Sequence, residues 1–327
     1  MGSDNAATTL EEYIDGVPDI NVLGYIGWYS LPDPHMEREQ LVRLAKAAKM
    51  SEDHLPGPPR VADAFRRATR YTDKANKKPQ ATTGSSVLYT FMLRPVSSTR
   101  EETEVHLVLE ILDKQGKSLE HVEAARIVLN KKTDFVTTTI LPTWTKGHIV
   151  YEPLIETELN EFRAEFIQAK KEVEPQNIRK TIRDELWEMN ALNVRSKGGV
   201  YFIPVGNKDR LVALETWVNS LGASLHTLPL PDTGKQKDMV KAAFESDVHG
   251  QAHEMIGQLT NLTKEGKKMP PSVWNRYKTR LNDLTKRTKQ YSDLVEEEMG
   301  KAGTELIMLH EKIFSILEND QVSEGRS

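Results

Sequence analysis

Residues 195–231 read RSKGGVYFIPVGNKDRLVALETWVNSLGASLHTLPLP and form the clearest structural unit of the chain. A β-rich run at 200–204 precedes a helical pattern that starts after Asn207, a favourable N-cap residue, and ends at Gly222. A second β-rich run follows at 224–230. A strand, a crossover helix and another strand satisfy the minimum for a βαβ connection, so the two strands are expected to run parallel. The unit indicates where a hydrophobic core forms, but it contains no motif typical of a particular reaction or ligand.

The sequence before this unit alternates between extended and helical patterns. Residues 20–31 are β-rich and end before Pro32, and helical spacing follows at 33–48 and 60–70. From residue 86 the apolar period changes to two, which predicts an antiparallel meander. Its four strands are expected at 87–96, 105–111, 122–129 and 135–141, with a turn at 113–117. Helical spacing returns at 154–173 and, after Pro175, at 178–189.

The last part of the chain is helical in pattern throughout, at 237–263 and again at 272–319. In the second stretch, apolar residues from Val273 to Ile316 follow steps of three and four. Such a regular apolar edge requires a partner helix. At 1.5 Å per residue the stretch would be roughly 70 Å long, although Gly300 and Gly303 can divide it in two.

The expected fold class is therefore α+β. We expect an antiparallel β-meander and a small βαβ-like unit packed by helices, followed by a C-terminal α-helical hairpin or coiled coil. The expected divisions are a flexible N-terminus at 1–18, an α+β body at 19–232, the helical hairpin at 236–320 and a tail at 321–327. Within the body, a strand and helices occupy 19–71, the meander 86–142, and helices with the strand–helix–strand unit 153–232.

Composition excludes several classes of function. The 327 residues carry a net charge of −4, so the whole molecule has no general attraction for nucleic acid or anionic lipid. The chain has no cysteine, which excludes disulfides, thiolate metal sites and cysteine nucleophiles and fits a reducing compartment. The first residues lack the pattern of a secretory signal, and no stretch approaches a membrane span. We therefore expect a cytoplasmic protein with no membrane partner.

The best candidate metal ligands are Glu245, His249 and His253, which recur every four residues and so lie on one side of a helix. Their position argues for a simpler interpretation, because both histidines point away from the apolar stripe that the same helix is expected to bury. That stripe comprises Phe244, Val248, Ala252, Met255, Leu259 and Leu262. A solvated polar face is therefore favoured, unless His310 and Glu311 of the partner helix come within coordination distance.

Two basic groups are candidates for nucleic-acid binding, at 264–289 and at 179–197. The first has nine basic residues and two acidic ones, a local surplus that can hold phosphates. Its basic side chains project from several sides of the expected helix, so the exterior of a coiled coil explains them equally well. The candidate contacts are Arg179, Lys180, Arg183, Arg195, Lys197, Arg276, Arg280 and Arg287.

The remaining titratable residues are scattered, and no motif has the spacing of a nucleotide loop or a catalytic triad. No catalytic residue and no cofactor is expected. An enzyme or metal-binding protein of unknown reaction stays open as an alternative.

Three segments together resemble a known group of proteins: LGYIGWYSLPDPHMEREQLVRLAKAA at 23–48, LPGPPRVADAFRRAT at 55–69 and GGVYFIP at 198–204. They are similar to an uncharacterised family of bacterial, chiefly actinobacterial, proteins that also occurs in phages and mobile elements. The resemblance covers roughly 20–232 and implies a phage or mobile-element context. It supplies no catalytic or binding residue, because that family carries no assigned activity.

The leading hypothesis is a non-catalytic interaction or assembly protein that forms a homo-oligomer or binds a protein partner through its C-terminal helices. The apolar edge from Val273 to Ile316 is expected to be buried against residues 239–262, another subunit, or both. Its central residues are Tyr277, Leu281, Leu284, Tyr291, Val295, Leu306, Leu309 and Ile313. Nucleic-acid binding through the two basic groups is the alternative.

Overall fold

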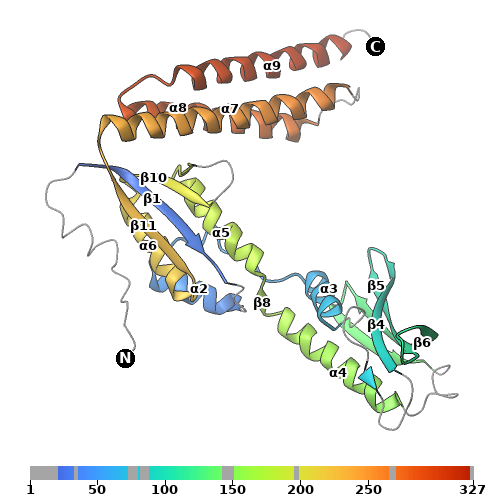
Figure 1. Cartoon of the computed structure of the whole chain (residues 1–327). Coiled ribbons are helices and arrows are strands. Elements are labelled where there is room, and N and C mark those ends of the chain that lie inside the picture. The colour runs from blue at the N-terminus through green and yellow to red at the C-terminus, as the bar shows by residue number, and fades with distance from the viewer. Residues whose placement is uncertain are drawn as a thin grey trace, which may run out of the picture. The chain divides into compact units, whose positions relative to one another are not determined.

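The computed structural model describes residues 21–32, 36–72, 80–81, 88–141, 151–194, 199–264 and 270–324 (Figure 1). It has the expected mixed α+β architecture with antiparallel sheets. The chain divides into two compact units. The first comprises Met1–Pro34, Arg43–His54 and Arg179–Ser327, and the second comprises His35–Val42 and Leu55–Ile178. This division differs from the expected one, because the C-terminal helices share a unit with the first strand. The expected segment 1–18 lies outside the described residues.

A five-stranded antiparallel sheet in the order β3-β4-β5-β6-β7 dominates the second unit. Its strands are β3 (Gln80–Ala81), β4 (Leu88–Ser98), β5 (Glu102–Leu112), β6 (Ser118–Asn130) and β7 (Phe135–Ile140). The four long strands are those of the predicted meander. Between β5 and β6, the Asp113 carboxylate accepts hydrogen bonds from the backbone N–H groups of Gln115 and Lys117, both at 2.8 Å, and so shapes the predicted turn.

Helices α3 (Val61–Thr72) and α4 (Glu152–Ala169) supply the apolar cover of this sheet. The Phe65 ring of α3 meets the rings of Phe162 and Phe166 of α4 edge-on, with centroids 5.5 and 6.2 Å apart. These rings share one buried cluster with Leu107 and Leu109 of β5, whose inward positions follow from the period of two. Two short strands, β2 (Met36–Glu37) and β8 (Glu172–Val173), pair nearby.

The first unit contains a four-stranded sheet in the order β11-β1-β10-β9. Its strands are β1 (Val22–Ser30), β9 (Leu192–Asn193), β10 (Val200–Pro204) and β11 (Ser224–Pro231). Because β1 runs antiparallel to both β10 and β11, those two strands point the same way, as the βαβ pattern predicts. They are not neighbours, however, since β1 lies between them.

Close packing explains a glycine in β1. A side chain at Gly24 would come within 2.4 Å of the Ile203 backbone oxygen and 2.5 Å of the Phe202 ring, so only glycine lets β10 approach. After β10, a 3₁₀ turn (Val205–Asn207) leads into α6 (Lys208–Ser220), which ends before Gly222 at a φ of +73°. The expected side-chain cap by Asn207 is wrong, because its amide donates to the Met189 carbonyl at 2.9 Å instead.

Two further helices belong partly to each unit: α2 (Arg38–Ala47) and α5 (Pro175–Glu188). The C-terminal part then forms three helices rather than the predicted two: α7 (Gly234–Lys264), α8 (Pro271–Val295) and α9 (Gly300–Glu324). The helical stretch predicted at 272–319, which the sequence allowed to divide at Gly300 and Gly303, divides slightly earlier, where Glu296 adopts the left-handed conformation with φ +57°. Gly300 begins the next helix instead of interrupting one. None of the helices described in the structure is both long and apolar enough to span a lipid bilayer.

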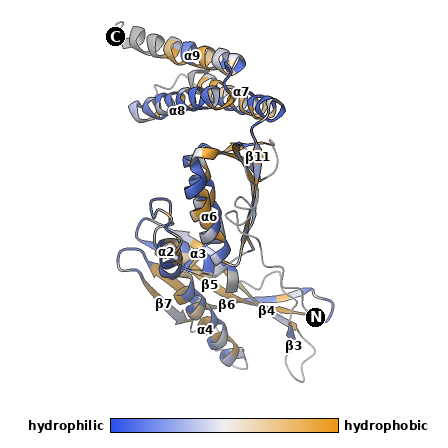
Figure 2. Cartoon of the chain, turned by 90° about the vertical axis from the view of Figure 1, so that its left-hand side faces the viewer, coloured by the Kyte–Doolittle hydropathy of each residue, from blue (hydrophilic) through white to orange (hydrophobic). Residues whose placement is uncertain are grey.

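Helices α7 and α9 run parallel, and a ladder of polar contacts fixes their register. The Lys241 ammonium donates to Glu297 at 2.6 Å. One turn further, the Glu245 carboxylate accepts from the Lys301 backbone N–H at 3.1 Å, and the next turn pairs His249 with Glu305 at 2.6 Å. Each contact joins residues 56 apart in sequence. Figure 1 shows α9 beside α7, and Figure 2 shows hydrophobic and hydrophilic segments alternating along α9.

Candidate functional site

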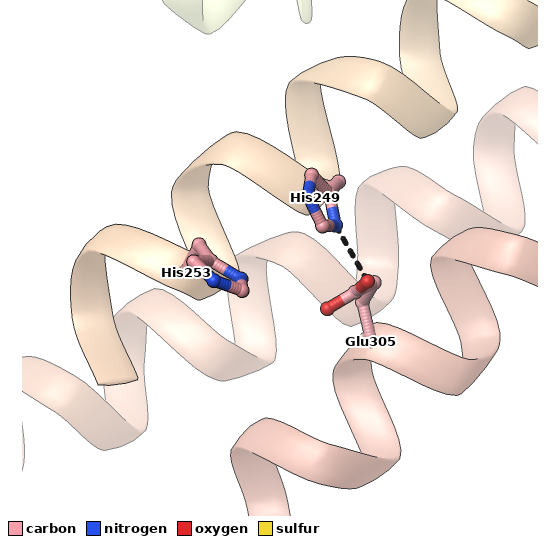
Figure 3. Close-up of side chains that lie close together, drawn as sticks. All are labelled: His249, His253 and Glu305. Carbon is pink, nitrogen blue, oxygen red and sulfur yellow. Dashed lines mark hydrogen bonds and ion pairs between the residues drawn. The ribbon is translucent and has the colours of Figure 1, made fainter. Parts of the chain in front are cut away.

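The metal candidates of the sequence lie on α7 and meet α9. His249 and His253 are one helical turn apart, and their ring centroids are separated by 5.0 Å (Figure 3). Across from them, Glu305 of α9 places a carboxylate oxygen 2.6 Å from Nδ1 of His249. One ligand atom from each of the three residues lies within 4.8 Å of the others. The structure therefore joins two sequence-predicted residues with one that sequence reasoning missed.

The other residues considered for this site have different roles. Glu245 binds the first turn of α9 through the backbone N–H of Lys301, so it stabilises a helix N-terminus and does not join the histidines. The His310 ring lies 4.4 Å from the ring of Phe314 on α9. Neither His310 nor Glu311 belongs to the cluster, because Glu305 occupies the position that the sequence analysis assigned to them.

The eight apolar residues predicted at a partner interface are buried within the single chain. Tyr277, Leu281, Leu284, Tyr291, Val295, Leu306, Leu309 and Ile313 all join one core cluster. Phe244 and Val248 of α7 belong to the same cluster, so the apolar edge is covered by residues 239–262, as one of the expected arrangements required. A partner surface on these helices must therefore use other residues.

Helix α9 also carries large apolar side chains on its outside. Ile307, Met308 and Phe314 are 62%, 52% and 50% exposed. Ile307 and Phe314 are seven residues apart and so lie on one face, whereas Met308 is about 100° around the helix from Ile307. Together with Gly303 and His310, which continue the same face at steps of three and four, Ile307 and Phe314 form what we term the outer stripe: Gly303, Ile307, His310 and Phe314.

The nucleic-acid candidates are dispersed. Arg287 does not contribute to an exposed basic surface, in contrast to the prediction. It is buried on α8, donates to the Ala191 carbonyl at 3.2 Å and stacks 4.4 Å from the Trp187 ring. Arg179 donates to the Leu31 carbonyl at 3.2 Å, and Lys180 pairs with Asp184 at 2.5 Å.

The other nucleic-acid candidates fall into two groups. Arg183 and Arg276 are exposed, and Arg280 pairs with Glu254 at 3.5 Å. Arg195 and Lys197 lie outside the described residues.

Buried Arg287 lies beside a partly buried carboxylate. The Asp247 carboxylate lies 3.6 Å from its Nη1, and burial raises the pKa of Asp247 while Arg287 opposes that shift. Burial also raises the pKa of Tyr291, whose hydroxyl donates to the Asn190 carbonyl at 2.7 Å. These contacts connect α8 to the segment before β9 and have a structural explanation.

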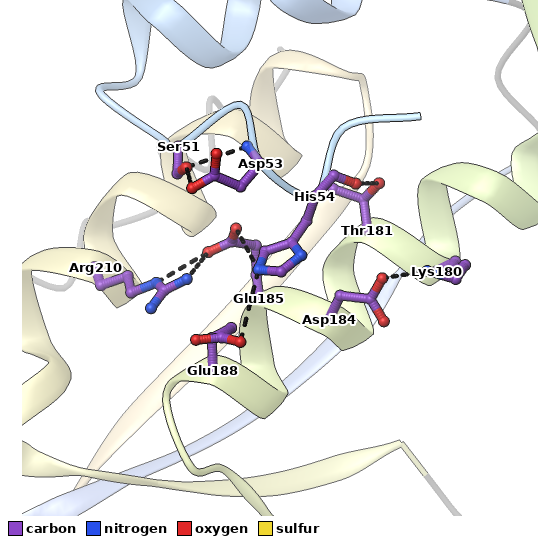
Figure 4. Close-up of polar contacts among 9 residues, drawn as sticks. All are labelled: Ser51, Asp53, His54, Lys180, Thr181, Asp184, Glu185, Glu188 and Arg210. Carbon is purple, nitrogen blue, oxygen red and sulfur yellow. Dashed lines mark hydrogen bonds and ion pairs between the residues drawn. The ribbon is translucent and has the colours of Figure 1, made fainter. Parts of the chain in front are cut away.

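A second polar cluster surrounds the buried Glu185 of α5 (Figure 4). The Arg210 guanidinium donates from Nε to its Oε2 at 3.0 Å, and the His54 ring lies 4.0 Å from Oε1. Thr181 donates to the His54 carbonyl at 2.7 Å, which holds the 51–54 loop against α5. The arrangement joins α5, α6 and this loop. We interpret it as a stabilising ion pair.

Of three comparisons with known proteins, one assigns the chain to a family and none assigns an activity. The matching family model covers residues 22–322, which include the whole second unit and most of the first. The chain belongs to DUF6744, a family of unknown function. No curated protein and no solved structure matches the chain. The family assignment agrees with the expectation of an uncharacterised family.

Proposed function

We propose that this protein is a non-catalytic assembly protein that self-associates through the outer stripe of α9. The observation that carries the proposal is the exposure of Ile307 and Phe314, at 62% and 50%, on a face of α9 adjacent to the face that Leu309 and Ile313 bury. Burying a side chain of this size is worth about 1.5–3 kcal/mol. Exposed apolar groups of this kind mark interaction sites.

The proposed occupant of the stripe is α9 of a second copy. Steps of three and four residues are the spacing that lets two helices interlock, and α9 itself supplies a helix with this spacing on its outer face. In a two-fold dimer the same patch meets itself, so no further surface is needed. Gly303 has open space around it, which favours close approach at one end of the contact.

The test is the molar mass of the full chain in solution, measured by light scattering over a range of concentrations. The wild-type protein should approach twice the mass of the 37.1 kDa chain, and Ile307→Asp or Phe314→Asp should return it to the mass of one chain. Met308→Asp is the matched control, because it places the same charge on an equally exposed apolar residue outside the stripe. A wild-type mass of one chain at every concentration, or an unchanged mass in Ile307→Asp, would overturn the proposal.

Nucleic-acid binding is the second candidate function. It is supported by three exposed lysines on one side of α8, Lys278, Lys286 and Lys289, which a helical projection places within about 80° of each other. Exposed Arg276 lies on another side of α8. Fluorescence anisotropy with labelled DNA tests this function, since replacing the three lysines by glutamine should weaken binding and reduce its salt dependence. DNA binding that is unchanged by these substitutions would contradict this second candidate function.

The cellular setting is also a proposal. We place the protein in the bacterial cytoplasm, in association with a phage or mobile element. The support is the absence of cysteine and the resemblance of 20–232 to proteins from such sources. Cell fractionation of the native host, with antibody detection, should find the protein in the cytoplasmic fraction. Recovery from the periplasm or the culture medium would contradict the assignment.

A further inference from the structure

Three side chains at the contact of α7 and α9 have the composition of a metal site. We propose that His249, His253 and Glu305 bind a divalent transition-metal ion, for which Zn²⁺ is the best match. One potential ligand atom from each residue lies within 4.8 Å of the other two. This inference is independent of the proposed self-association, because none of the three residues belongs to the outer stripe.

The backbone already places the ligands on facing turns. Two histidines at i and i+4 project from the same side of α7, which is the spacing that helical metal sites use. Glu305 arrives from α9 because the helices run parallel, with the Glu245–Lys301 contact setting the register one turn earlier. The third ligand is therefore positioned by packing and capping contacts, separate from any ion.

The distances require only small side-chain movements. With bonds of about 2.1 Å to nitrogen and oxygen, a tetrahedral ion holds its ligand atoms about 3.4 Å apart. Nδ1 of His249 is closer to Glu305 than that value, at 2.6 Å, and no two of the three ligand atoms are more than 4.8 Å apart. The His249 side chain is 57% exposed, so its ring can turn without disturbing the core. Glu305 is only 19% exposed and is the more fixed of the two.

The types of ligand atom at the site indicate which metal ion fits it best. Two imidazoles and one carboxylate suit Zn²⁺ and similar transition ions, whereas Mg²⁺ and Ca²⁺ prefer oxygen ligands alone. Three protein ligands leave a fourth position at the surface for water. Bound in this way, the ion would link α7 to α9 and stabilise the docking of the last helix.

The experiment uses the full, untagged chain, stripped with a chelator and then titrated with Zn²⁺ by calorimetry. One ion per chain is expected, and Mg²⁺ should give no heat of binding at the same concentrations. His253→Ala is the decisive variant, because among the described residues His253 makes no hydrogen bond or ion pair whose loss would disturb the fold. It should weaken Zn²⁺ binding by about tenfold or more, since losing even an outer partner costs that much at characterised metal sites.

His226→Ala is the control, because it removes an exposed histidine of β11 that lies outside both the cluster and the outer stripe. It should leave Zn²⁺ affinity unchanged. As a second measurement, Zn²⁺ should raise the thermal unfolding midpoint of the wild-type chain and of His226→Ala but not of His253→Ala or Glu305→Gln. Absence of Zn²⁺ binding by the wild-type chain, or equal affinity in His253→Ala, would overturn the proposal.

Discussion

The two sheets of this protein are assembled in different ways. The sheet of the second unit joins β4, β5, β6 and β7 in chain order through short turns. The sheet of the first unit places β1 between β10 and β11, so its central strand pairs with residues distant in sequence, as Trp28 does with Val200. The first arrangement depends on local contacts and the second on contacts that close a long loop. Mutations should therefore affect the two sheets separately and for different reasons.

The largest effect is expected from Phe65→Ala in the second unit. The ring is buried between α3 and α4, and its removal leaves a cavity that costs about 3–5 kcal/mol. Hydrogen exchange should show lost protection in β4–β7 and α4, while the sheet of the first unit keeps its protection. Equal loss in both units would show that the two buried clusters do not act separately.

Gly24→Ala should have the next largest effect on stability and should destabilise the first unit alone. The added methyl group would lie 2.4 Å from the Ile203 backbone oxygen, which cannot move without shifting β10. Overpacking of this kind costs about 3 kcal/mol, to be measured by chemical denaturation. Gly27→Ala on the same strand is the control, because its nearest contact is the flexible end of Ile203 at 3.3 Å. Similar losses in both variants would refute the steric explanation.

A smaller loss of stability is expected when a side-chain acceptor is removed at one connection in each unit. Asp113→Ala removes the acceptor of two backbone hydrogen bonds in the β5–β6 turn. Asn219→Ala removes one, from the Leu225 N–H at the junction of α6 and β11. Each bond contributes about 1 kcal/mol, so Asp113→Ala should cost more than Asn219→Ala in urea unfolding. The reverse order would mean that the turn forms without its aspartate.

The smallest expected effect is a change in how the stability of the protein depends on pH. Burial raises the pKa of Glu215 on α6, and a weak hydrogen bond from Thr227 at 3.4 Å only partly opposes the shift. A raised folded-state pKa means that the stabilising contribution is present below the ordinary glutamate pKa and is lost as pH rises through the folded value. Glu215→Gln should therefore gain stability relative to wild type between mildly acidic and neutral pH. Parallel stability curves for the two proteins would contradict this assignment.

Local patterns were sufficient for the meander and for the existence of most helices. The alternation around Val105–Ile111 and the turn at Asp113 are properties of neighbouring residues, so the sequence predicts them directly. The position of β1 between β10 and β11 could not be predicted in this way. The same strand–helix–strand pattern is compatible with parallel strands that are neighbours and with parallel strands that another strand separates. A break near Gly300 was allowed by the sequence, but its position at Glu296 was not predicted, because a left-handed residue other than glycine has no clear sequence signal.

The candidate sites show the same limit. His249 and His253 stand out because their spacing is local, but the choice of Glu305 over Glu311 depends on the direction and register of α9. A hairpin of two helices implies antiparallel packing, whereas α9 runs parallel to α7. The outer stripe was missed for another reason: α9 has two apolar faces, and the stronger pattern of Leu306, Leu309 and Ile313 obscured the weaker one.

The position of β1 also has a consequence for synthesis. β1 ends at Ser30, yet both strands that pair with it lie beyond residue 199, after the whole second unit has been made. At about 5–20 residues per second, a ribosome leaves this strand without its partners for roughly 10–40 s. The inserted meander has time to fold during that interval, whereas the nascent β1 edge stays open to chaperones and to neighbouring chains.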